Sequence, residues 1–272
     1  MPASLQLGPF TLSSATIVWM AVVLAAMFVG NRLAKKQGLQ LENTFYRILL
    51  VAVVAARLPL LWTYWDSYRT SVWRMLDIRD GGLHAGAGML AAWLCVLVLA
   101  WCQPLQRRAL LGAMLTASVV WLVALAANHW GNTNTQVLPE LGVVNVQGQT
   151  ASLAQWRGKP TVVNLWASWC PPCRREMPAF VAVAQKYPNA NVVLLNQGED
   201  VATVANYLQQ QNLSTTHVWL DPSRAIGAHF GQQALPTTLF FDAQGRLVTI
   251  RVGELSEATL QAQLAPLLQA AP

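Results

Sequence analysis

Charged side chains are scarce in this sequence. They make up 11% of its 272 residues, against about 25% in an average globular protein. The shortage is concentrated in three stretches without any Asp, Glu, Lys or Arg, namely residues 1–31, 81–106 and 109–139. Uncharged apolar runs of this length are typical of membrane-spanning helices. The chain is therefore not purely soluble, and the part beyond residue 139, where both signs of charge return, belongs to a different kind of domain.

The sequence also lacks the basic segment that begins a cleaved signal peptide, so we expect the first apolar run to be retained. Histidine and cysteine are few, with four of each. No second Cys-x-x-Cys motif and no His pair with zinc-ligand spacing accompanies the motif at Cys170 and Cys173. Because a structural zinc site needs about four such ligands, we expect no metal and no other cofactor.

The apolar runs predict four membrane-spanning helices, at about Leu12–Gly30, Phe45–Trp62, Leu83–Trp101 and Ala109–Ala127. Five basic residues lie in the first and third loops, against three in the longer second loop. Basic residues favour cytoplasmic loops, so we expect both termini outside. The chain would then be a multi-pass protein of the cytoplasmic (inner) membrane in contact with membrane lipids, and its C-terminal domain would lie in the periplasm or outside.

The net charge of +6 comes entirely from the membrane half. Ten basic and four acidic residues precede Asn128, and eight of each follow. A basic protein can bind nucleic acid, but positive charge that flanks membrane helices accounts for this excess. We therefore expect no nucleic-acid partner.

Three parts of the chain differ in pattern: a membrane domain over residues 1–127, a polar linker over 128–139 and a folded domain over 140–272. Residues 162–167 form a continuous apolar run typical of a buried strand. Strand and helix patterns then alternate as far as a hairpin and a closing helix, for which Ser256 is the expected N-cap. The predicted fold class is a four-helix transmembrane domain followed by an α/β domain with a mixed sheet.

The motif Trp169-Cys170-Pro171-Pro172-Cys173 lies between the predicted buried strand and the next helix. A Cys-x-x-Cys at such a junction is typical of a redox-active dithiol. Cys170 would be the nucleophile, because free N–H groups and the helix dipole stabilise a thiolate there, and Cys173 would resolve the mixed disulfide. A plain structural disulfide is the alternative.

The residues around the two cysteines also bear on the direction of the reaction. Pro171 and Pro172 have no N–H to donate to the thiolate, which destabilises the reduced form and favours a reducing couple. Arg174 and Arg175 act in the opposite sense. On balance we expect a reductant.

The C-terminal domain resembles the TlpA/ResA-like branch of the thioredoxin superfamily over about residues 138–270. The matching segments are Leu138-Pro139, Gly158-Lys159-Pro160, Asn164 to Cys173, Glu176-Met177-Pro178 and Leu235-Pro236-Thr237-Thr238. This resemblance implies a thioredoxin-like fold, a redox disulfide between Cys170 and Cys173, and a buried Glu176 with a raised pKa that moves a proton during exchange.

The resemblance further implies a cis peptide bond before Pro236, with the Leu235 backbone binding an extended substrate strand. Trp169 would shape the substrate surface, whereas Trp166 would lie in the core. The substrates would be disulfides of exported proteins, such as apocytochromes during cytochrome c biogenesis or copper-site proteins. A transmembrane electron donor of the DsbD type would recharge the dithiol.

The membrane half resembles part of the prolipoprotein diacylglyceryl transferase family over about residues 12–127. The resemblance rests on Ala55-Ala56-Arg57-Leu58, Tyr64 and the run from Asp77 to Gly88. The later spans of that family are missing, so the resemblance implies a truncated relative used as an anchor or docking surface. Arg57 would either serve a function within the membrane or extend to its surface, and His84 with Gly82 and Gly86 would serve helix packing.

Cys95 and Cys102 lie on one predicted helix, about 10.5 Å apart along its axis, too far for a disulfide. The sequence as a whole therefore predicts a membrane-anchored, extracytoplasmic protein-disulfide reductase. Two alternatives stay open: a lipid-modifying membrane enzyme with an appended redox module, and a copper-binding module.

Overall fold

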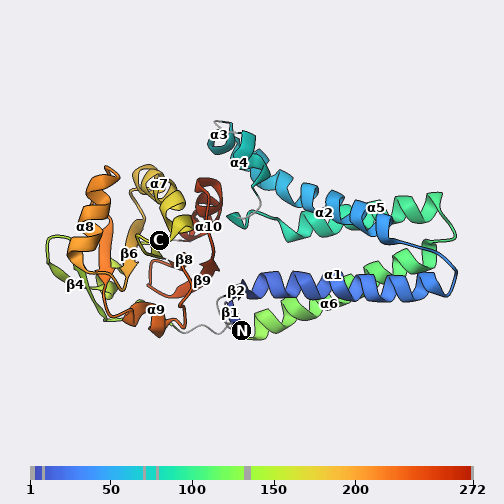
Figure 1. The fold of residues 1–272 in the computed structure, drawn as a ribbon, viewed down its shortest axis with the longest axis horizontal. Helices are drawn as coiled ribbons and strands as arrows, with labels where there is room; N and C mark the ends of the chain where they lie inside the picture. Colours follow the sequence, from blue (N-terminus) through green and yellow to red (C-terminus); the bar gives the residue numbers. More distant parts are fainter. Residues whose placement is uncertain (1–3, 8–9, 70–71, 78–79, 132–135, 271–272) are drawn as a thin grey trace. The chain divides into compact units, whose positions relative to one another are not determined.

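The structure is a computed structural model of residues 1–272 that describes all of them except 1–3, 8–9, 70–71, 78–79, 132–135 and 271–272. The chain forms two compact units, the first mainly of residues 5–78 and 82–133 and the second mainly of residues 134–272. The first unit holds the long apolar helices, and the second holds a mixed sheet with its covering helices (Figure 1).

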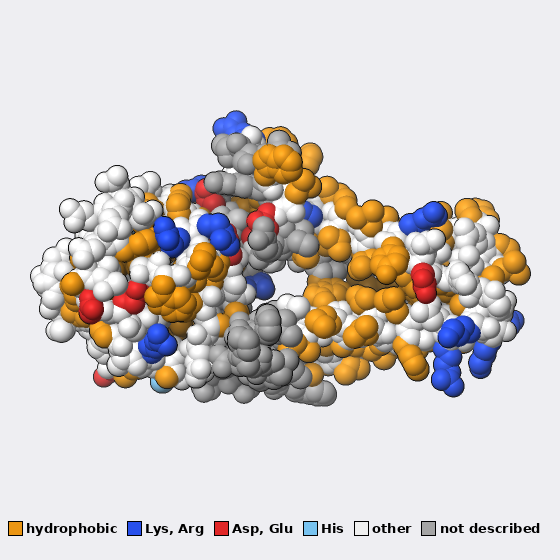
Figure 2. Space-filling model, viewed as in Figure 1, with side chains coloured by type: hydrophobic (Ala, Val, Ile, Leu, Met, Phe, Trp, Pro, Cys, Tyr) orange, Lys and Arg blue, Asp and Glu red, His pale blue; other side chains and the backbone are white. Residues whose placement is uncertain are grey.

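Among the described residues, four helices of the first unit are long and apolar enough to cross a membrane. They are α1 (Ser14–Lys35), α2 (Glu42–Thr63), α5 (Ala85–Cys102) and α6 (Arg107–Gly131). Helix α1 packs along α6, and α2 packs along α5. Large apolar side chains are exposed along all four helices (Figure 2), as expected of surfaces that face lipid.

The other elements of this unit are short. Strands β1 (Ser4–Leu7) and β2 (Phe10–Ser13) form a two-stranded sheet, and α3 (Trp65–Tyr68) and α4 (Val72–Leu76) lie between α2 and α5. The first predicted span, at about Leu12–Gly30, corresponds to α1, which begins two residues later and ends five residues later. The predicted linker is wrong at its start, because residues 128–131 continue α6.

The close contact between α2 and α5 is made at Gly88. A Cβ atom at this position would lie 3.0 Å from the Ala52 carbonyl oxygen and 3.1 Å from the Ala56 Cβ, so a larger residue would push the helices apart. Gly86, which we expected to pack, instead lies beside the ring of His84. The predicted packing role of Gly86 is therefore wrong, and Gly88, two positions further along the helix, makes the contact.

The second unit is built on a seven-stranded sheet with the order β4-β3-β7-β6-β5-β8-β9. The strands are β3 (Gly142–Asn145), β4 (Thr150–Ser152), β5 (Thr161–Trp166), β6 (Asn191–Gln197), β7 (Val218–Asp221), β8 (Thr237–Phe241) and β9 (Leu247–Val252). Strand β5 pairs parallel with β6 and antiparallel with β8. All six of its residues are buried, as a central strand with helices on both faces requires.

Helices cover both faces of this sheet. They are η2 (Leu153–Trp156, a 3-10 helix), α7 (Pro171–Lys186), α8 (Val201–Gln210), α9 (Ala225–His229) and α10 (Glu257–Gln269). Residues of α7, α8 and α10 join one apolar cluster, and residues of α9 and η2 join another. The predicted α/β fold around a mixed sheet is therefore confirmed.

The predicted buried strand at residues 162–167 corresponds to β5, which begins and ends one residue earlier. The N-cap role of Ser256 is confirmed, since its side chain accepts from the Thr259 N–H. Helix α9 was not predicted, because five residues that include Gly227 are too short to show a helical period.

Candidate active site

The two cysteines lie where the central strand β5 gives way to α7. Cys170 is the N-cap residue of α7, and the first two helical positions are Pro171 and Pro172. Proline is well suited to the first turn of a helix, because its fixed φ is already helical and the N–H groups there have no partner within the helix. The sequence therefore starts the helix at a defined residue and places Cys170 at its positive end.

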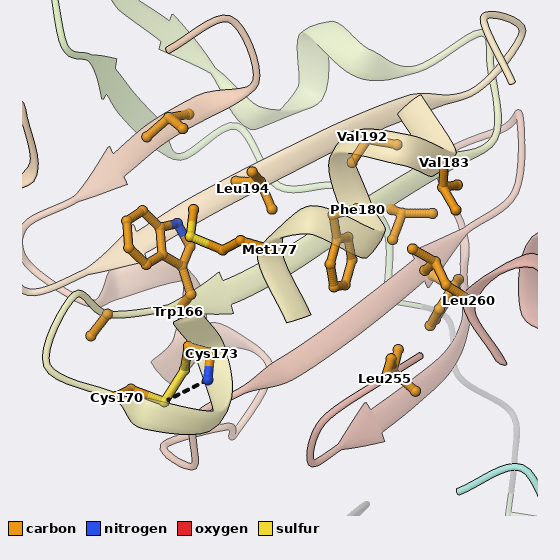
Figure 3. Close-up of a cluster of buried hydrophobic side chains, with 14 of the residues drawn as sticks. Trp166, Cys170, Cys173, Met177, Phe180, Val183, Val192, Leu194, Leu255 and Leu260 are labelled. Atoms are coloured by element: carbon orange, nitrogen blue, oxygen red, sulfur yellow. Dashed lines mark hydrogen bonds between the residues drawn. A yellow bond between two sulfur atoms is a disulfide. The ribbon is translucent and has the colours of Figure 1, made fainter. Parts of the chain in front are cut away.

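Cys170 and Cys173 form a disulfide, at the first turn of the helix that also carries Met177 and Phe180 (Figure 3). The side chains are 3% and 0% exposed respectively. The Cys173 N–H donates to the Cys170 Sγ at 3.3 Å. Because Pro171 and Pro172 have no N–H, the Cys173 N–H is the first backbone donor that α7 can offer to the Cys170 Sγ.

Glu176 lies one turn beyond Cys173 and is 1% exposed. Its Oε1 accepts from the Asn164 Nδ2 at 2.7 Å, and its Oε2 accepts from the Leu255 N–H at 2.9 Å. Burial, which removes water from the charged form, raises the pKa of this carboxyl from 4.5 to about 8, against the lowering effect of these two donors. The carboxyl therefore changes its protonation near neutral pH, as proton transfer to and from a thiol requires.

The peptide bond between Leu235 and Pro236 is cis, as the resemblance implied. Thr237, the next residue, is the Cα partner of Leu165 in the pairing of β5 with β8. Pro236 therefore lies beside the end of β5 from which the chain runs on to Cys170. Pro236 is buried and Leu235 is half-buried. Both candidate substrate-binding residues therefore lie just before β8, beside the end of β5 that leads to the dithiol.

The two tryptophans before the disulfide differ in exposure. Trp166 is fully buried, as predicted, and Trp169 is 61% exposed beside Cys170. The loop between them is held by Glu199, whose carboxylate accepts from the Ser168 N–H at 2.7 Å, the Ser168 Oγ at 2.5 Å and the Asn196 Nδ2 at 2.6 Å. Sequence reasoning missed Glu199, since it follows a different strand 31 residues later.

Two polar residues of the membrane unit have structural partners. Arg57 is 4% exposed, and its guanidinium donates to the carbonyl oxygens of Met75, Asp77 and Gly82 and to the Tyr68 hydroxyl. The arginine thus extends to the loop before α5 and holds it. His84 is the N-cap of α5, and its Nδ1 accepts from the Ala87 N–H at 3.2 Å.

The remaining candidates are not brought together. Cys95 and Cys102 are both free thiols. Within the described residues, no group of three or more His, Cys, Asp or Glu side chains could hold a metal ion. The disulfide, Glu176 and the cis-proline are therefore the part of the described chain where predicted functional residues converge.

Two protein families match this chain. The redoxin model matches residues 133–264, and the prolipoprotein diacylglyceryl transferase model matches residues 2–154, which is more than half of the chain. Over 128 residues the chain is 30% identical to the thiol-disulfide oxidoreductase ResA of Bacillus thuringiensis, covering 46% of this chain and 73% of that protein. The chain belongs to both families. Its N-terminal half belongs to the transferase family and its C-terminal half to the ResA-type oxidoreductases.

Other relatives match the same half. The thiol:disulfide interchange protein HelX of Rhodobacter capsulatus is 31% identical over 111 residues, covering 41% of this chain and 62% of that protein. Among solved structures, a secreted Mycobacterium tuberculosis disulfide oxidoreductase is 25% identical with a TM-score of 0.42, covering 47% of this chain and 96% of that one.

Proposed function

We propose that this protein is a membrane-anchored thiol-disulfide oxidoreductase that reduces disulfides of exported proteins outside the cytoplasmic membrane. The observation that carries the proposal is the Cys170–Cys173 disulfide at the start of α7, with a buried carboxyl of raised pKa one turn further along the same helix. Strongly raised pKa values are concentrated at functional sites, so this carboxyl favours a redox role over a disulfide that serves stability alone.

The first step is attack by the outer cysteine. In the reduced protein the Cys170 thiolate attacks one sulfur of the substrate disulfide. A bond forms between Cys170 and that sulfur, the substrate S–S bond breaks, and the other substrate sulfur leaves as a thiolate that takes a proton. The α7 N-terminus and the Cys173 N–H stabilise the attacking thiolate.

The second step uses Glu176 as the base. The ionised carboxylate takes the proton of the Cys173 thiol, and the new thiolate attacks the Cys170 sulfur. The Cys170–Cys173 disulfide forms, and the second substrate sulfur leaves as a thiolate that takes a proton. Two electrons have then passed to the substrate, and a donor dithiol must return two electrons and two protons. A transmembrane carrier of the DsbD type fits this requirement.

The direction of transfer follows from the helix start. One backbone N–H, that of Cys173, can stabilise a thiolate at Cys170. Pro171 and Pro172 have no N–H and cannot contribute two further donors. A less stabilised thiolate makes the reduced form less stable, and the couple is then more reducing. The reductase direction rests on this argument.

Substrate binding would use the edge formed by Trp169 and the cis-proline. An extended substrate segment would pair with backbone groups of Leu235, in the turn before β8, while its disulfide faces Cys170. The apolar face of Trp169 gives contact area without side-chain selectivity. Apocytochromes and copper-site proteins with paired cysteines are suitable substrates.

The location follows from the charges of the membrane unit. Blue Lys and Arg side chains lie at the end of this unit that carries the α1–α2 and α5–α6 loops (Figure 2). Five basic residues lie in or next to these two loops, against three in the segment between α2 and α5. Positive loops favour the cytoplasmic side. This supports the proposal that the chain after α6 lies on the opposite side, where disulfides persist. The membrane unit acts as a lipid-embedded anchor, and the engagement of Arg57 and His84 in holding a loop and capping a helix favours this over transferase chemistry.

A trapping experiment tests the proposal. Cys173→Ala leaves Cys170 unable to release its partner, so mixed disulfides with exported proteins should accumulate and be identified by mass spectrometry. Cys170→Ala with Cys173→Ala should trap nothing, and Cys102→Ala should behave as the wild type. Normal expression of Cys173→Ala without any trapped protein would contradict the proposed activity.

A further inference from the structure

The carboxylate of Glu199 binds the turn that carries Trp169. The Cys170 N–H donates to the Ala167 carbonyl oxygen at 3.2 Å, so Ser168 and Trp169 are the two central residues of a turn. That bond leaves the N–H groups of both central residues without a partner inside the turn. Glu199 supplies a partner to the first of them, since its Oε2 accepts from the Ser168 N–H at 2.7 Å and its Oε1 from the Ser168 Oγ at 2.5 Å. The turn is therefore fixed from outside by one side chain.

The sheet brings this carboxylate to the turn. Strands β5 and β6 are parallel neighbours, and Trp166 and Asn196 are Cα partners near their ends. Gly198 follows β6 with a φ of 81°, a left-handed conformation that favours glycine, and Glu199 comes next. The fully buried Asn196 donates from its Nδ2 to the Glu199 Oε2 at 2.6 Å. Glu199 thus links the end of β6 to the turn after β5.

Trp169 has little support from contacts of its own. Its side chain is 61% exposed, and within the part of the chain that the structure describes it makes no hydrogen bond and no ring contact. An exposed aromatic ring is driven by the hydrophobic effect to fold back onto nearby apolar surface. The direction of the ring is therefore determined by the backbone of the turn, and Glu199 holds that backbone at Ser168.

We propose that Glu199 is a positioning residue, which holds the turn so that the Trp169 ring stays exposed as a contact surface for protein substrates beside Cys170. A surface held in its binding conformation binds more tightly, because less conformational freedom is lost on binding. Cys170 depends less on Glu199, since it is also the N-cap of α7. Glu199 therefore favours protein disulfides over small ones and takes no part in the sulfur chemistry.

A second effect of the carboxylate must be separated from this one. A negative charge near Cys170 disfavours its thiolate, so removing the charge would speed attack on every disulfide. Glu199→Gln removes the charge and keeps the contacts. Its amide oxygen can accept both bonds of Oε2, and its amide nitrogen can donate to the Ser168 Oγ, because a hydroxyl also accepts. Glu199→Ala removes the charge and the contacts together.

This inference rests on the proposed function, and it is tested by single-turnover kinetics of the full-length protein in detergent micelles. The protein is reduced, freed of reductant and mixed with insulin or with glutathione disulfide. Glu199→Ala should slow the reduction of insulin by roughly tenfold, the equivalent of about one hydrogen bond to a charged group. It should leave the reduction of glutathione disulfide nearly unchanged. Glu199→Gln should reduce both disulfides at the wild-type rates, and slowing equal to that of Glu199→Ala would overturn the positioning role.

A double-mutant cycle shows whether Glu199 acts through Trp169. Residues that act as one unit have effects that do not add. Trp169→Ala combined with Glu199→Ala should therefore reduce insulin no more slowly than Trp169→Ala alone. If Glu199→Ala does not fold, Ser168→Ala replaces it in the cycle, because it removes the hydroxyl bond and keeps the backbone N–H, and its smaller loss should likewise vanish beside Trp169→Ala. Losses that add would overturn the proposal.

The outcomes separate this role from the proposed function. A wild type that reduces neither insulin nor glutathione disulfide contradicts both. A wild type that reduces both disulfides, with Glu199→Ala equal to it on insulin, overturns the role of Glu199 and leaves the oxidoreductase activity standing.

Discussion

The raised pKa of Glu176 makes the stability of the second unit depend on pH. Glu176→Gln replaces the carboxyl by a neutral amide of nearly the same shape. In the wild type the folded state holds the proton more tightly than the unfolded chain, since its pKa is about 8 rather than 4.5. The resulting stabilisation is fully present below about pH 4.5 and is lost as the pH rises through about 8. The variant has no proton to lose and should not show this decline.

The magnitude follows from the pKa difference. A rise from 4.5 to about 8, at about 1.4 kcal/mol per pKa unit, corresponds to about 5 kcal/mol of unfolding free energy. This value is an upper bound, because local opening that admits water relieves part of the penalty. At or below about pH 4 the two proteins should be equally stable, and at about pH 9.5 the variant should be more stable by up to this amount.

Hydrogen–deuterium exchange of the full-length protein measures this difference. Peptides from β5 and α7 are compared between variant and wild type at the same pH, so the intrinsic pH dependence of exchange cancels. At high pH the variant should be protected more strongly, by up to about three and a half powers of ten at about 1.4 kcal/mol per tenfold. Equal protection at both pH values would refute the assignment of a raised pKa to Glu176.

Three further predictions concern the surroundings of the site and the membrane unit. Arg175→Gln should raise the pKa of Glu176 and Glu254→Gln should lower it, as measured by ¹³C NMR titration. Each variant should change the free energy of unfolding by less than about 1 kcal/mol, because the ion pair is partly exposed. Shifts of the same sign in the two variants would contradict the charge assignment. Trp169→Ala should slow reduction of protein disulfides more than that of glutathione disulfide, with unchanged thermal stability; equal slowing would argue against a substrate surface. Arg57→Met should destabilise the membrane unit in detergent by about 2–4 kcal/mol, since buried carbonyls lose their donor, with unchanged disulfide reduction.

The start of the active site could be predicted because its signals are local. Cys170 as N-cap, proline at the next two positions and Glu176 one turn beyond Cys173 all follow from the order of residues along one helix. The partners of Glu176 are different, since Asn164 is 12 residues away and Leu255 is 79 residues away. No periodicity links such positions, so the orientation of the carboxyl and the burial that raises its pKa depend on the tertiary fold.

The membrane unit shows the same division. Long apolar runs predicted four helices, since hydropathy reports directly on a span. The role of Arg57 was left open, because it depends on a loop whose contacting carbonyls come 18 to 25 residues later. The helix contact at Gly88 rather than Gly86 depends on how α5 is rotated against α2, and several small residues in a row leave that rotation undetermined in the sequence.

The reduction potential of the Cys170–Cys173 couple tests the central claim most directly. It is measured on the full-length protein by equilibration with thiol buffers of known potential and alkylation of the free thiols. The account predicts a reducing couple, at or below about −270 mV, the value of thioredoxin. A potential near about −120 mV, typical of the strong periplasmic oxidant DsbA, would contradict the proposed direction of electron transfer.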